Sequence, residues 1–411
     1  MSLSQTAPAD SGGERLHGLD ALRGIALLLG VVLHASLSFM PLPIWIADND
    51  QSVGANILFF AIHLFRMAAF FLIAGYFAHL VIERRGVGGF VADRLKRIAG
   101  PLTVFWPIVL AGIIACFVWY AYIQNGYALP AEPPPEPPLT VGNFPLTHLW
   151  FLWVLLLFYA VLIAGRALIL AVDPEGRLGR AADAAVRVLV TPWALPVVAA
   201  PLAAALYWTP GWLMFFGIPT PDRGLIPNLA AATGFGSAFL LGFLIRRQGD
   251  LLARIARHWA VYLGFATGAG CTAFMLADGL APSLLPPTAP SLVNAALYAF
   301  AVFASAFAAL ALALRFLGGR RPAVRYLADA SYWIYIMHLP VVMAGQILVH
   351  QLGWPWPVKL VVVIGGSLAL LLATYELIVR HSFLGRFLNG RKVPWRRRAE
   401  PAETPALPAA A

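Results

Sequence analysis

Long apolar segments separated by short polar connections dominate this chain of 411 residues. A membrane-spanning helix needs about 20 mostly apolar residues, and in a bilayer only helices and closed barrels satisfy their own backbone hydrogen bonds. The chain is 60% hydrophobic and only 12% charged. It therefore predicts an all-α polytopic membrane protein with about ten transmembrane helices in one bundle. These segments lie near residues 19–39, 54–82, 98–122, 146–171, 190–208, 228–246, 257–277, 291–316, 327–349 and 357–380.

The positive charges fall in alternate connections between these segments. The net charge is +10, and Lys and Arg gather in every second connection, whereas the others are nearly free of them apart from Arg223. Cytoplasmic connections carry such an excess, so the pattern places both termini in the cytoplasm. The basic tail suits anionic lipid rather than nucleic acid, because interleaved aromatic residues are absent from it. The clustered residues are Arg84, Arg85, Arg94, Lys96, Arg97, Arg166, Arg177, Arg180, Arg187, Arg246, Arg247, Arg254, Arg257, Arg315, Arg320, Arg321 and Arg325.

The chain reads as one transmembrane domain over residues 19–381, between a disordered cytoplasmic lead, 1–18, and a tail, 382–411, that is basic and then rich in Pro and Ala. Residues 24–33 resemble a signal-peptide core, but no convincing cleavage site follows, which favours an uncleaved span. The Pro-rich run 132–138 predicts an extended spacer in an outer connection, with a lid as the alternative. Cys116 and Cys271 offer neither a disulfide framework nor a zinc site, so we expect no metal.

Arg23 and His34 are ionisable residues inside the first apolar segment. Eleven helical steps bring them to one face, roughly 16 Å apart along the axis. Such groups usually face a polar interior and mark a functional path. His34 can take a proton from a hydroxyl group, and the alternative is a structural hydrogen bond to a neighbouring helix. Arg23 either snorkels to headgroups or pairs with Asp20, which would leave donors for a phosphate or an amide.

His63 and Arg66 share one face of the second segment. Arg66 lies near mid-membrane, too deep to snorkel easily, so it requires a partner or water. A structural ion pair is one reading, but a polar cavity is favoured because no acidic residue lies at matching depth in the sequence. The following Ala74-Gly75 pair permits close helix approach, with Tyr76 facing the cavity or another helix.

Further polar residues complete a series of layers across the membrane. Tyr335 and His338 lie near the middle of the ninth segment, and Glu376 lies near the cytoplasmic end of the last. Asp20, Arg23 and Glu376 then form an inner layer, Arg66 and His338 a central one, and His63 and His34 an outer one. If their faces converge, these residues make a polar path across the bilayer.

Arg94 and Arg97 precede the third segment. Membrane anchoring alone explains them, and the functional alternative is a cytoplasmic grip on a phosphorylated donor. The sequence contains no apparent P-loop, dinucleotide fingerprint, metal-ligand motif or nucleophile elbow.

In this order, these motifs resemble the integral membrane acyltransferase family known as acyltransferase type 3. The resemblance runs from about residue 16 to 392 and includes Arg23-x10-His34, His63-x-x-Arg66-Met67, the 70–77 run Phe-Phe-Leu-Ile-Ala-Gly-Tyr-Phe, Arg94-x-x-Arg97, His148-Leu149-Trp150, the 331–340 run Ser-Tyr-Trp-Ile-Tyr-Ile-Met-His-Leu-Pro and Tyr375-Glu376-Leu377. The family often has Ser where this chain has Ala74, so a role for that hydroxyl is not carried over.

The resemblance implies a multi-pass enzyme of the bacterial inner (cytoplasmic) membrane that transfers an acyl group to a hydroxyl. The co-substrate would be acyl-CoA, with succinyl-CoA favoured over acetyl-CoA by a subfamily likeness, and no cofactor would be bound permanently. The acceptor would be a periplasmic glucan, and glucan-synthesis proteins are expected partners. His34 takes the family's catalytic position, with Arg23, and Arg23, Arg94 and Arg97 take positions associated with the donor.

Three alternatives to this function remain. One is an O-acetyltransferase of another envelope polysaccharide, and a second is a transporter for an acyl or anionic sugar metabolite. Against the transporter, no inverted repeat and no pair of broken spans is apparent in the sequence. The third is a non-catalytic membrane subunit, which would have no need of His and Arg at membrane depth.

Overall fold

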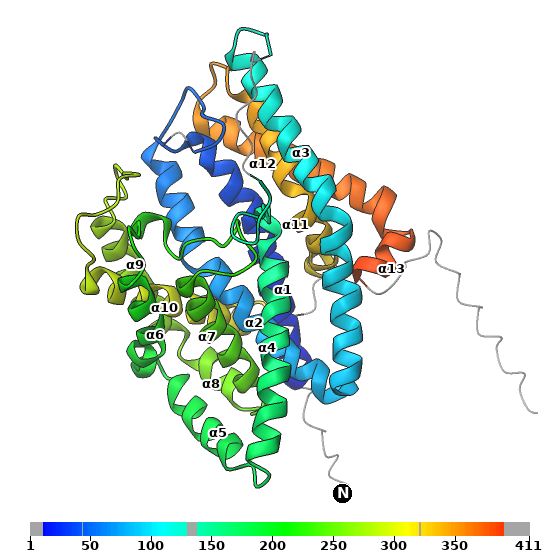
Figure 1. Cartoon of the computed structure of the whole chain (residues 1–411), viewed down its shortest axis with the longest axis vertical. Helices are drawn as coiled ribbons and strands as arrows, with labels where there is room; N and C mark the ends of the chain where they lie inside the picture. The colour runs from blue at the N-terminus through cyan, green and yellow to red at the C-terminus, as the bar shows by residue number, and fades with distance from the viewer. Residues whose placement is uncertain (1–10, 43, 130–137, 320–321, 390–411) are drawn as a thin grey trace, which may run out of the picture.

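The computed structural model describes residues 11–389 except 43, 130–137 and 320–321, and these described residues form helices without a strand (Figure 1). The Pro-rich spacer predicted at 132–138 falls almost entirely outside them, as does most of the tail. The α-helices are α1 (Ser11–Ser36), α2 (Val53–Arg94), α3 (Gly100–Gln124), α4 (Trp150–Val172), α5 (Arg177–Leu189), α6 (Leu195–Tyr207), α7 (Leu229–Arg246), α8 (Leu251–Arg257), α9 (Trp259–Leu276), α10 (Leu292–Phe316), α11 (Pro322–Val349), α12 (Trp356–Thr374) and α13 (Phe383–Asn389).

The predicted all-α membrane architecture is confirmed. Eight helical stretches of the described chain are long and apolar enough to cross a membrane, or nine when one bent pair is included. The count falls below about ten because Val53–Gln124, which contains two predicted spans, is counted as a single stretch despite a kink at Gly86. The helix α1 begins at Ser11 and so extends into the segment predicted to be a disordered lead.

The chain turns sharply at Gly86, between the two spans of that stretch. Gly86 has φ 68° and ψ 177°, a conformation that is unfavourable for residues with a Cβ. In Figure 1 the chain consequently descends along α2 and climbs back along α3. The second break lies between α5 and α6, where the helix axes bend by 101° around Pro192. Because α6 has only 13 residues, it is too short to span the membrane unaided.

Helices α2 and α7 pack backbone to backbone at two glycines. A Cβ on Gly75 would overlap the carbonyl oxygen of Phe239, and a Cβ on Gly242 would overlap the carbonyl oxygen of Leu72. The close helix approach predicted from Ala74-Gly75 is therefore confirmed, and α7 is the partner helix. This contact fixes the helix that carries His63 and Arg66.

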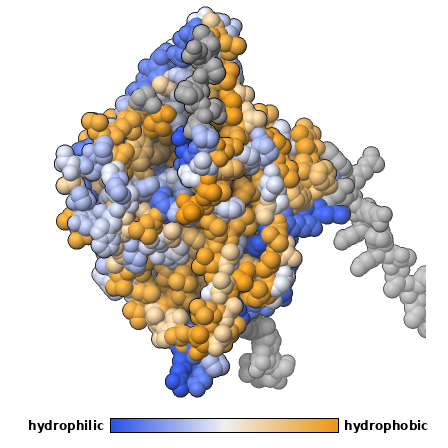
Figure 2. All heavy atoms as spheres, in the orientation of Figure 1, coloured by the Kyte–Doolittle hydropathy of each residue, from blue (hydrophilic) through white to orange (hydrophobic). Residues whose placement is uncertain are grey.

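The outer surface of the bundle is apolar, as expected for contact with lipid. Figure 2 shows hydrophobic residues over most of the middle of the molecule and hydrophilic residues gathered at its lower tip and upper left. Among the exposed apolar side chains are Val161, Leu168 and Leu170 of α4. The polar residues that lie deep in the bundle are therefore exceptions that require an explanation.

Candidate active site

Three histidines from different parts of the chain converge near the C-terminal end of α1, in the half of the bundle predicted to be the outer one. His34 lies near the end of α1, His148 in a short 3-10 turn before α4, and His338 on α11. The ring centroid of His34 lies 5.2 Å from that of His338 and 6.5 Å from that of His148, and the latter two are 4.8 Å apart. The indole of Trp45 stacks on His34 at 5.6 Å and an interplanar angle of 11°.

Backbone carbonyls fix the protonation pattern of two of these rings. Nε2 of His148 lies 3.1 Å from the carbonyl oxygens of both Tyr335 and Ile336, and Nδ1 of His338 lies 2.6 Å from the carbonyl oxygen of Tyr335. Carbonyl oxygens only accept hydrogen bonds, so these nitrogens carry the protons. The opposite nitrogens, Nδ1 of His148 and Nε2 of His338, are then bare acceptors. Both are buried and without a partner among the described residues, as is Nδ1 of His34.

Pro340 explains why these carbonyls are available inside a helix. An α-helical carbonyl normally accepts from the amide four residues later, and for Ile336 that residue is Pro340, which has no N–H. The proline therefore opens the α11 hydrogen-bond ladder at the point where His148 donates into it. The hydroxyl of Tyr335 returns the contact by donating to the backbone carbonyl of His148 at 2.8 Å.

Arg66 adds a cation to the same site. Its side chain is buried, its Nε has no hydrogen-bond partner, and it makes no ion pair with a carboxylate in the described part of the chain. Gly30, one turn before His34, gives it room, since a Cβ there would lie 2.8 Å from its Nη1 and 3.7 Å from Nε2 of His338. A buried guanidinium without a counter-charge is a favourable partner for an anion or a developing oxyanion.

His63 lies one turn before Arg66, at the edge of this group. Its ring stacks on Phe59 at 5.1 Å, and it lines a pocket of about 10 Å³ together with Trp150 and Tyr298. That volume is about the size of a single water molecule. His63 is thus placed beside the histidine cluster and toward the segment that follows α6.

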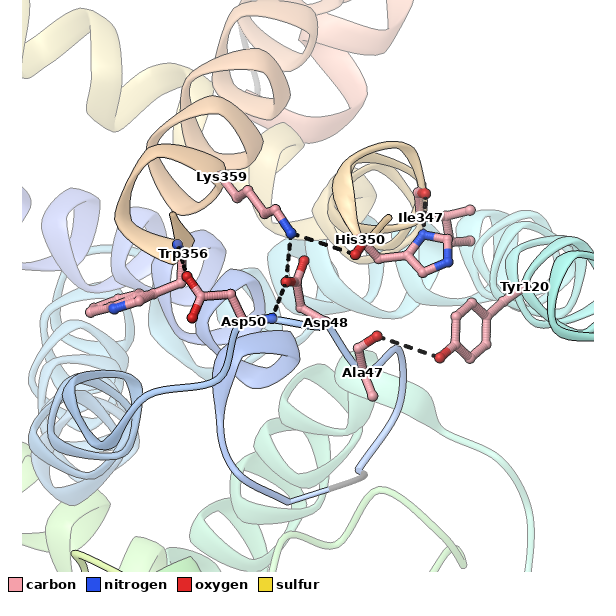
Figure 3. Close-up of polar contacts among 8 residues, drawn as sticks. All are labelled: Ala47, Asp48, Asp50, Tyr120, Ile347, His350, Trp356 and Lys359. Carbon is pink, nitrogen blue, oxygen red and sulfur yellow. Dashed lines mark hydrogen bonds and ion pairs between the residues drawn. The ribbon is translucent and has the colours of Figure 1, made fainter. Parts of the chain in front are cut away.

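The segment between α1 and α2 that carries Trp45 is tied down by a buried ion pair (Figure 3). Nζ of Lys359 lies 2.7 Å from Oδ1 of Asp48, and each side chain is only 1% exposed. A carboxylate oxygen of Asp50 also accepts from the amide of Trp356 at 2.6 Å. These contacts anchor the segment to the start of α12 and thereby hold the indole over His34.

The opposite end of the bundle, predicted to be the inner one, holds the predicted donor-binding residues in separate contacts. Arg23 pairs with Asp20 at 3.1 Å, as one of its two sequence readings predicted, and lies over the ring of Phe77 at 5.7 Å. The neighbouring Tyr76 does not join the histidines, because its ring packs beneath the guanidinium of Arg246, 6.0 Å away.

The other two predicted donor-binding residues lie at the turn between α2 and α3. The guanidinium of Arg94 lies 5.1 Å from the ring centroid of Phe90 and 5.3 Å from that of Tyr159, while Arg97 pairs with Asp93 at 3.1 Å. A π-helical turn over Leu95–Ala99 follows, and such turns widen the helix locally. The two arginines thus lie close together near this turn, each within 4 Å of a carboxylate oxygen of Asp93.

Glu376 belongs to another network. Its carboxylate accepts from Tyr326 at 3.0 Å and pairs with Arg380 at 2.8 Å and with His381 at 3.2 Å. The sequence reading placed it in the inner layer of one continuous path, and the structure puts it in a local cluster of the last helix and α11.

Several residues of the histidine cluster and its surroundings were absent from the predicted set. His148 entered the sequence reading only as a point of family likeness, and Trp45 and Gly30 were not considered at all. Gly30 could have been found, because it lies one turn before His34 on the same helix face. Lys359 could also have been noticed as a lone cation in an apolar segment. Trp45 could not, because its position depends on the course of the loop between α1 and α2.

Comparison with known proteins assigns the family. The model of an acyltransferase domain matches residues 16–376. Two similar relatives are named glucans biosynthesis protein C, from Escherichia coli strains SMS-3-5 and HS. They are 29% and 28% identical to this chain over 147 residues, which are 34% of this chain and 36% of each relative. The matched segment is thus about a third of those relatives' length, and no solved structure matches. The chain therefore belongs to the acyltransferase 3 family of integral membrane proteins.

Proposed function

We propose that this acyltransferase moves an acyl group from cytoplasmic acyl-CoA to a hydroxyl of a periplasmic glucan, with His34 as general base. The observation that carries the proposal is the convergence of His34, His148 and His338 beside Arg66, a buried cation with no carboxylate partner among the described residues. The name of the E. coli relatives, glucans biosynthesis protein C, supports a glucan as acceptor.

In this reaction, one end of the bundle binds the donor and the other carries out the acyl transfer. Arg23, Arg94 and Arg97 would bind the CoA phosphates at the inner end, where Arg pairs well with phosphate. Arg23 and His34 are eleven residues apart on α1, a rise of roughly 16 Å. An extended pantetheine arm can cover that distance and bring the thioester carbonyl to the histidines.

At the outer end, a nitrogen of His34 takes the proton of the acceptor hydroxyl as the oxygen attacks the thioester carbonyl. Arg66 faces the negative charge that develops on the carbonyl oxygen. The carbon–sulfur bond then breaks, and the proton held by His34 neutralises the departing thiolate. The products are an O-acyl glucan and CoA with a free thiol. Transfer through an acyl-histidine is the less favoured variant.

Succinyl is the acyl group we expect, and acetyl is the alternative. The test uses purified full-length protein in detergent or nanodiscs, given succinyl-CoA or acetyl-CoA with and without periplasmic glucan, while free thiol and acylated glucan are measured. We expect glucan-dependent thiol release from succinyl-CoA, lost in His34→Ala and reduced by about two to three orders of magnitude in Arg66→Gln.

Three results would change the proposal. Preference for acetyl-CoA would keep the reaction and replace the acyl group. Unchanged acylation by a folded, membrane-inserted His34→Ala protein would eliminate the mechanism. Uptake of an acyl metabolite into vesicles without consumption of CoA would instead identify a transporter.

A further inference from the structure

A second cavity lies apart from the histidine cluster, at the outer ends of α6, α9 and α10. Its volume is about 540 Å³, which is within the usual range for small-molecule sites, about 300–1,000 Å³. Its walls are the connection after α6, the connection after α9 and the first turn of α10. A pale, weakly hydrophilic surface covers the region of these connections at the left of Figure 2.

The lining of this cavity suits a neutral, hydroxyl-rich ligand. The aromatic side chains are Tyr207, Trp208 and Trp212, and the short polar ones include Thr209, Ser283, Thr288, Ser291 and Asn294. Among the described residues of the lining, Asp278 is the only charged one, and none is Lys or Arg. A site with a carboxylate and no cation disfavours phosphates and other anions. Flat rings with scattered hydroxyl and amide groups can contact both the C–H faces and the hydroxyls of a sugar.

Trp208 requires a comparison with an ordinary membrane anchor, since Trp is enriched at membrane interfaces. Its side chain is 71% exposed and its ring packs edge-on against Tyr207, with 6.0 Å between centroids. Trp193, before the opposite end of the same helix, is 75% exposed but does not line this cavity. Both tryptophans are exposed, but of the two only Trp208 lines the cavity.

Asp278 follows α9 in a conformation that few side chains adopt. Its φ is 49°, in the left-handed region, where Asp and Asn are the commonest residues after Gly. The conformation is held by its own backbone, whose carbonyl accepts from Ala281 at 2.8 Å. The carboxylate forms no ion pair in the part of the chain that the structure describes, so it remains available to accept from hydroxyl groups.

One segment joins this cavity to the wall behind the histidines. Nε1–H of Trp212 donates to the carbonyl of Gly217 at 2.7 Å, and the Trp212 ring packs on Tyr298 at 5.6 Å. Tyr298 and Ile218 line the small pocket that contains His63. Gly217 has φ 67°, and a Cβ there would overlap the hydroxyl of Tyr298. The outer cavity and the pocket beside His63 therefore share one tightly packed wall.

We infer that the cavity lined by Trp208, Trp212 and Asp278 is a binding subsite for a neutral glycan chain, the acceptor of the transfer. This inference rests on the proposed function for its role, because a chain held there would present its next sugar toward the His63 side of the histidine cluster. Sugar binding itself does not require the donor, so the subsite is testable without catalysis.

The binding experiment uses the full-length protein in lipid nanodiscs, without acyl-CoA. Cellotetraose and a tetrasaccharide of glucuronic acid are titrated by calorimetry into wild type, Trp208→Ala, Asp278→Asn and the control Trp193→Ala. Asp278→Asn removes the charge and keeps a residue that tolerates the left-handed conformation. We expect Trp208→Ala to weaken cellotetraose binding about tenfold, Trp193→Ala to leave it unchanged, and Asp278→Asn to improve binding of the uronic tetrasaccharide relative to cellotetraose.

Steady-state rates separate this inference from the proposed function. With glucan as acceptor, Trp208→Ala should raise KM for the glucan and leave KM for acyl-CoA unchanged. Wild-type affinity for cellotetraose in both cavity variants would overturn the subsite, as would acylation of glucan by a protein that binds no tetrasaccharide. Cavity-dependent binding without any consumption of acyl-CoA would support the subsite and reject the acyltransfer proposed above.

Discussion

The carbonyl oxygen of Ile336 accepts a hydrogen bond from Nε2 of His148 at 3.1 Å, in place of the amide that Pro340 lacks. An interruption of one helix thus becomes the acceptor that sets the tautomer of a histidine on another segment. The proline of the 331–340 motif is therefore part of the candidate site although its own side chain carries no reactive group.

Replacing Pro340 by Ala should weaken catalysis while sparing the fold. The new amide would compete for the carbonyl of Ile336 and release His148 from one of its two acceptors. We expect kcat to fall about five- to tenfold, the effect of losing an orienting hydrogen bond of about 1 kcal/mol. Thermal unfolding should be unchanged or shift upward. Pro201→Ala, in the interior of α6, is the control, and an equal loss of kcat there would contradict this role for Pro340.

Gly30→Ala should damage the reaction through Arg66. The added methyl would lie 2.8 Å from Nη1 of Arg66, the far end of a flexible side chain, so the guanidinium moves and the backbone does not. If Arg66 faces the oxyanion, kcat should fall about a hundredfold with little change in unfolding temperature. At Gly24, on the same helix, a methyl would meet only ordinary contacts of 3.4 Å or more. Gly24→Ala should retain activity, and wild-type kcat in Gly30→Ala would argue against Arg66.

Lys359→Met should destabilise the outer end of the bundle strongly. The substitution leaves the buried carboxylate of Asp48 without its counter-charge, which should lower the free energy of unfolding by about 3–5 kcal/mol. We also expect lower kcat, because the segment carrying Trp45 loses its anchor. Reversible unfolding in mild detergent measures the first effect. The exposed Arg187–Asp250 pair is the control, and Arg187→Met should cost no more than about 1 kcal/mol.

Gly75→Ala should disrupt the contact between α2 and α7. The methyl meets the carbonyl of Phe239, a backbone atom that cannot turn away, so we expect a loss of about 3 kcal/mol or more, or failure to fold. Gly165→Ala, in α4, is the matched control because a Cβ there has no neighbour within 4 Å. That substitution should be neutral or stabilising by up to about 1 kcal/mol. Equal stability of the two variants would contradict the close packing described here.

The sequence predicted the membrane architecture because each span carries its own hydrophobic signal. Position along a span also predicts a membrane depth for Arg66, Tyr335 and His338, and that depth stays a prediction. Depth does not reveal which way a helix face is turned, and so the convergence of these residues with His34 required the structure. For the same reason Glu376, a member of the predicted inner layer, turns toward other partners. Tyr76 packs against Arg246 of another helix, which was one of its two predicted alternatives.

Three of the residues that sequence reasoning missed lie where helical periodicity carries no information. His148 lies in a short turn before α4, and Trp45 and Asp48 lie in the connection after α1. Their places depend on contacts with α11 and α12, more than 180 residues away. Local sequence patterns do not encode such contacts. The partner helices do carry local signals, however: Pro340 interrupts α11, and Lys359 is a lone cation in the apolar α12.

The paired glycines of α2 and α7 also limit how this enzyme can move. A slide of one helical turn would bring a large side chain, such as Phe71 or His79, into a space that admits only a hydrogen atom. Sliding of α2 along α7 is therefore blocked, and the two helices behave as one rigid unit that keeps Arg66 at a fixed position along the bundle axis. In the proposed reaction, an opening for the acyl chain must then come from the lightly buried helices around this pair, such as α4, in whose most apolar part only 17% of the residues are buried.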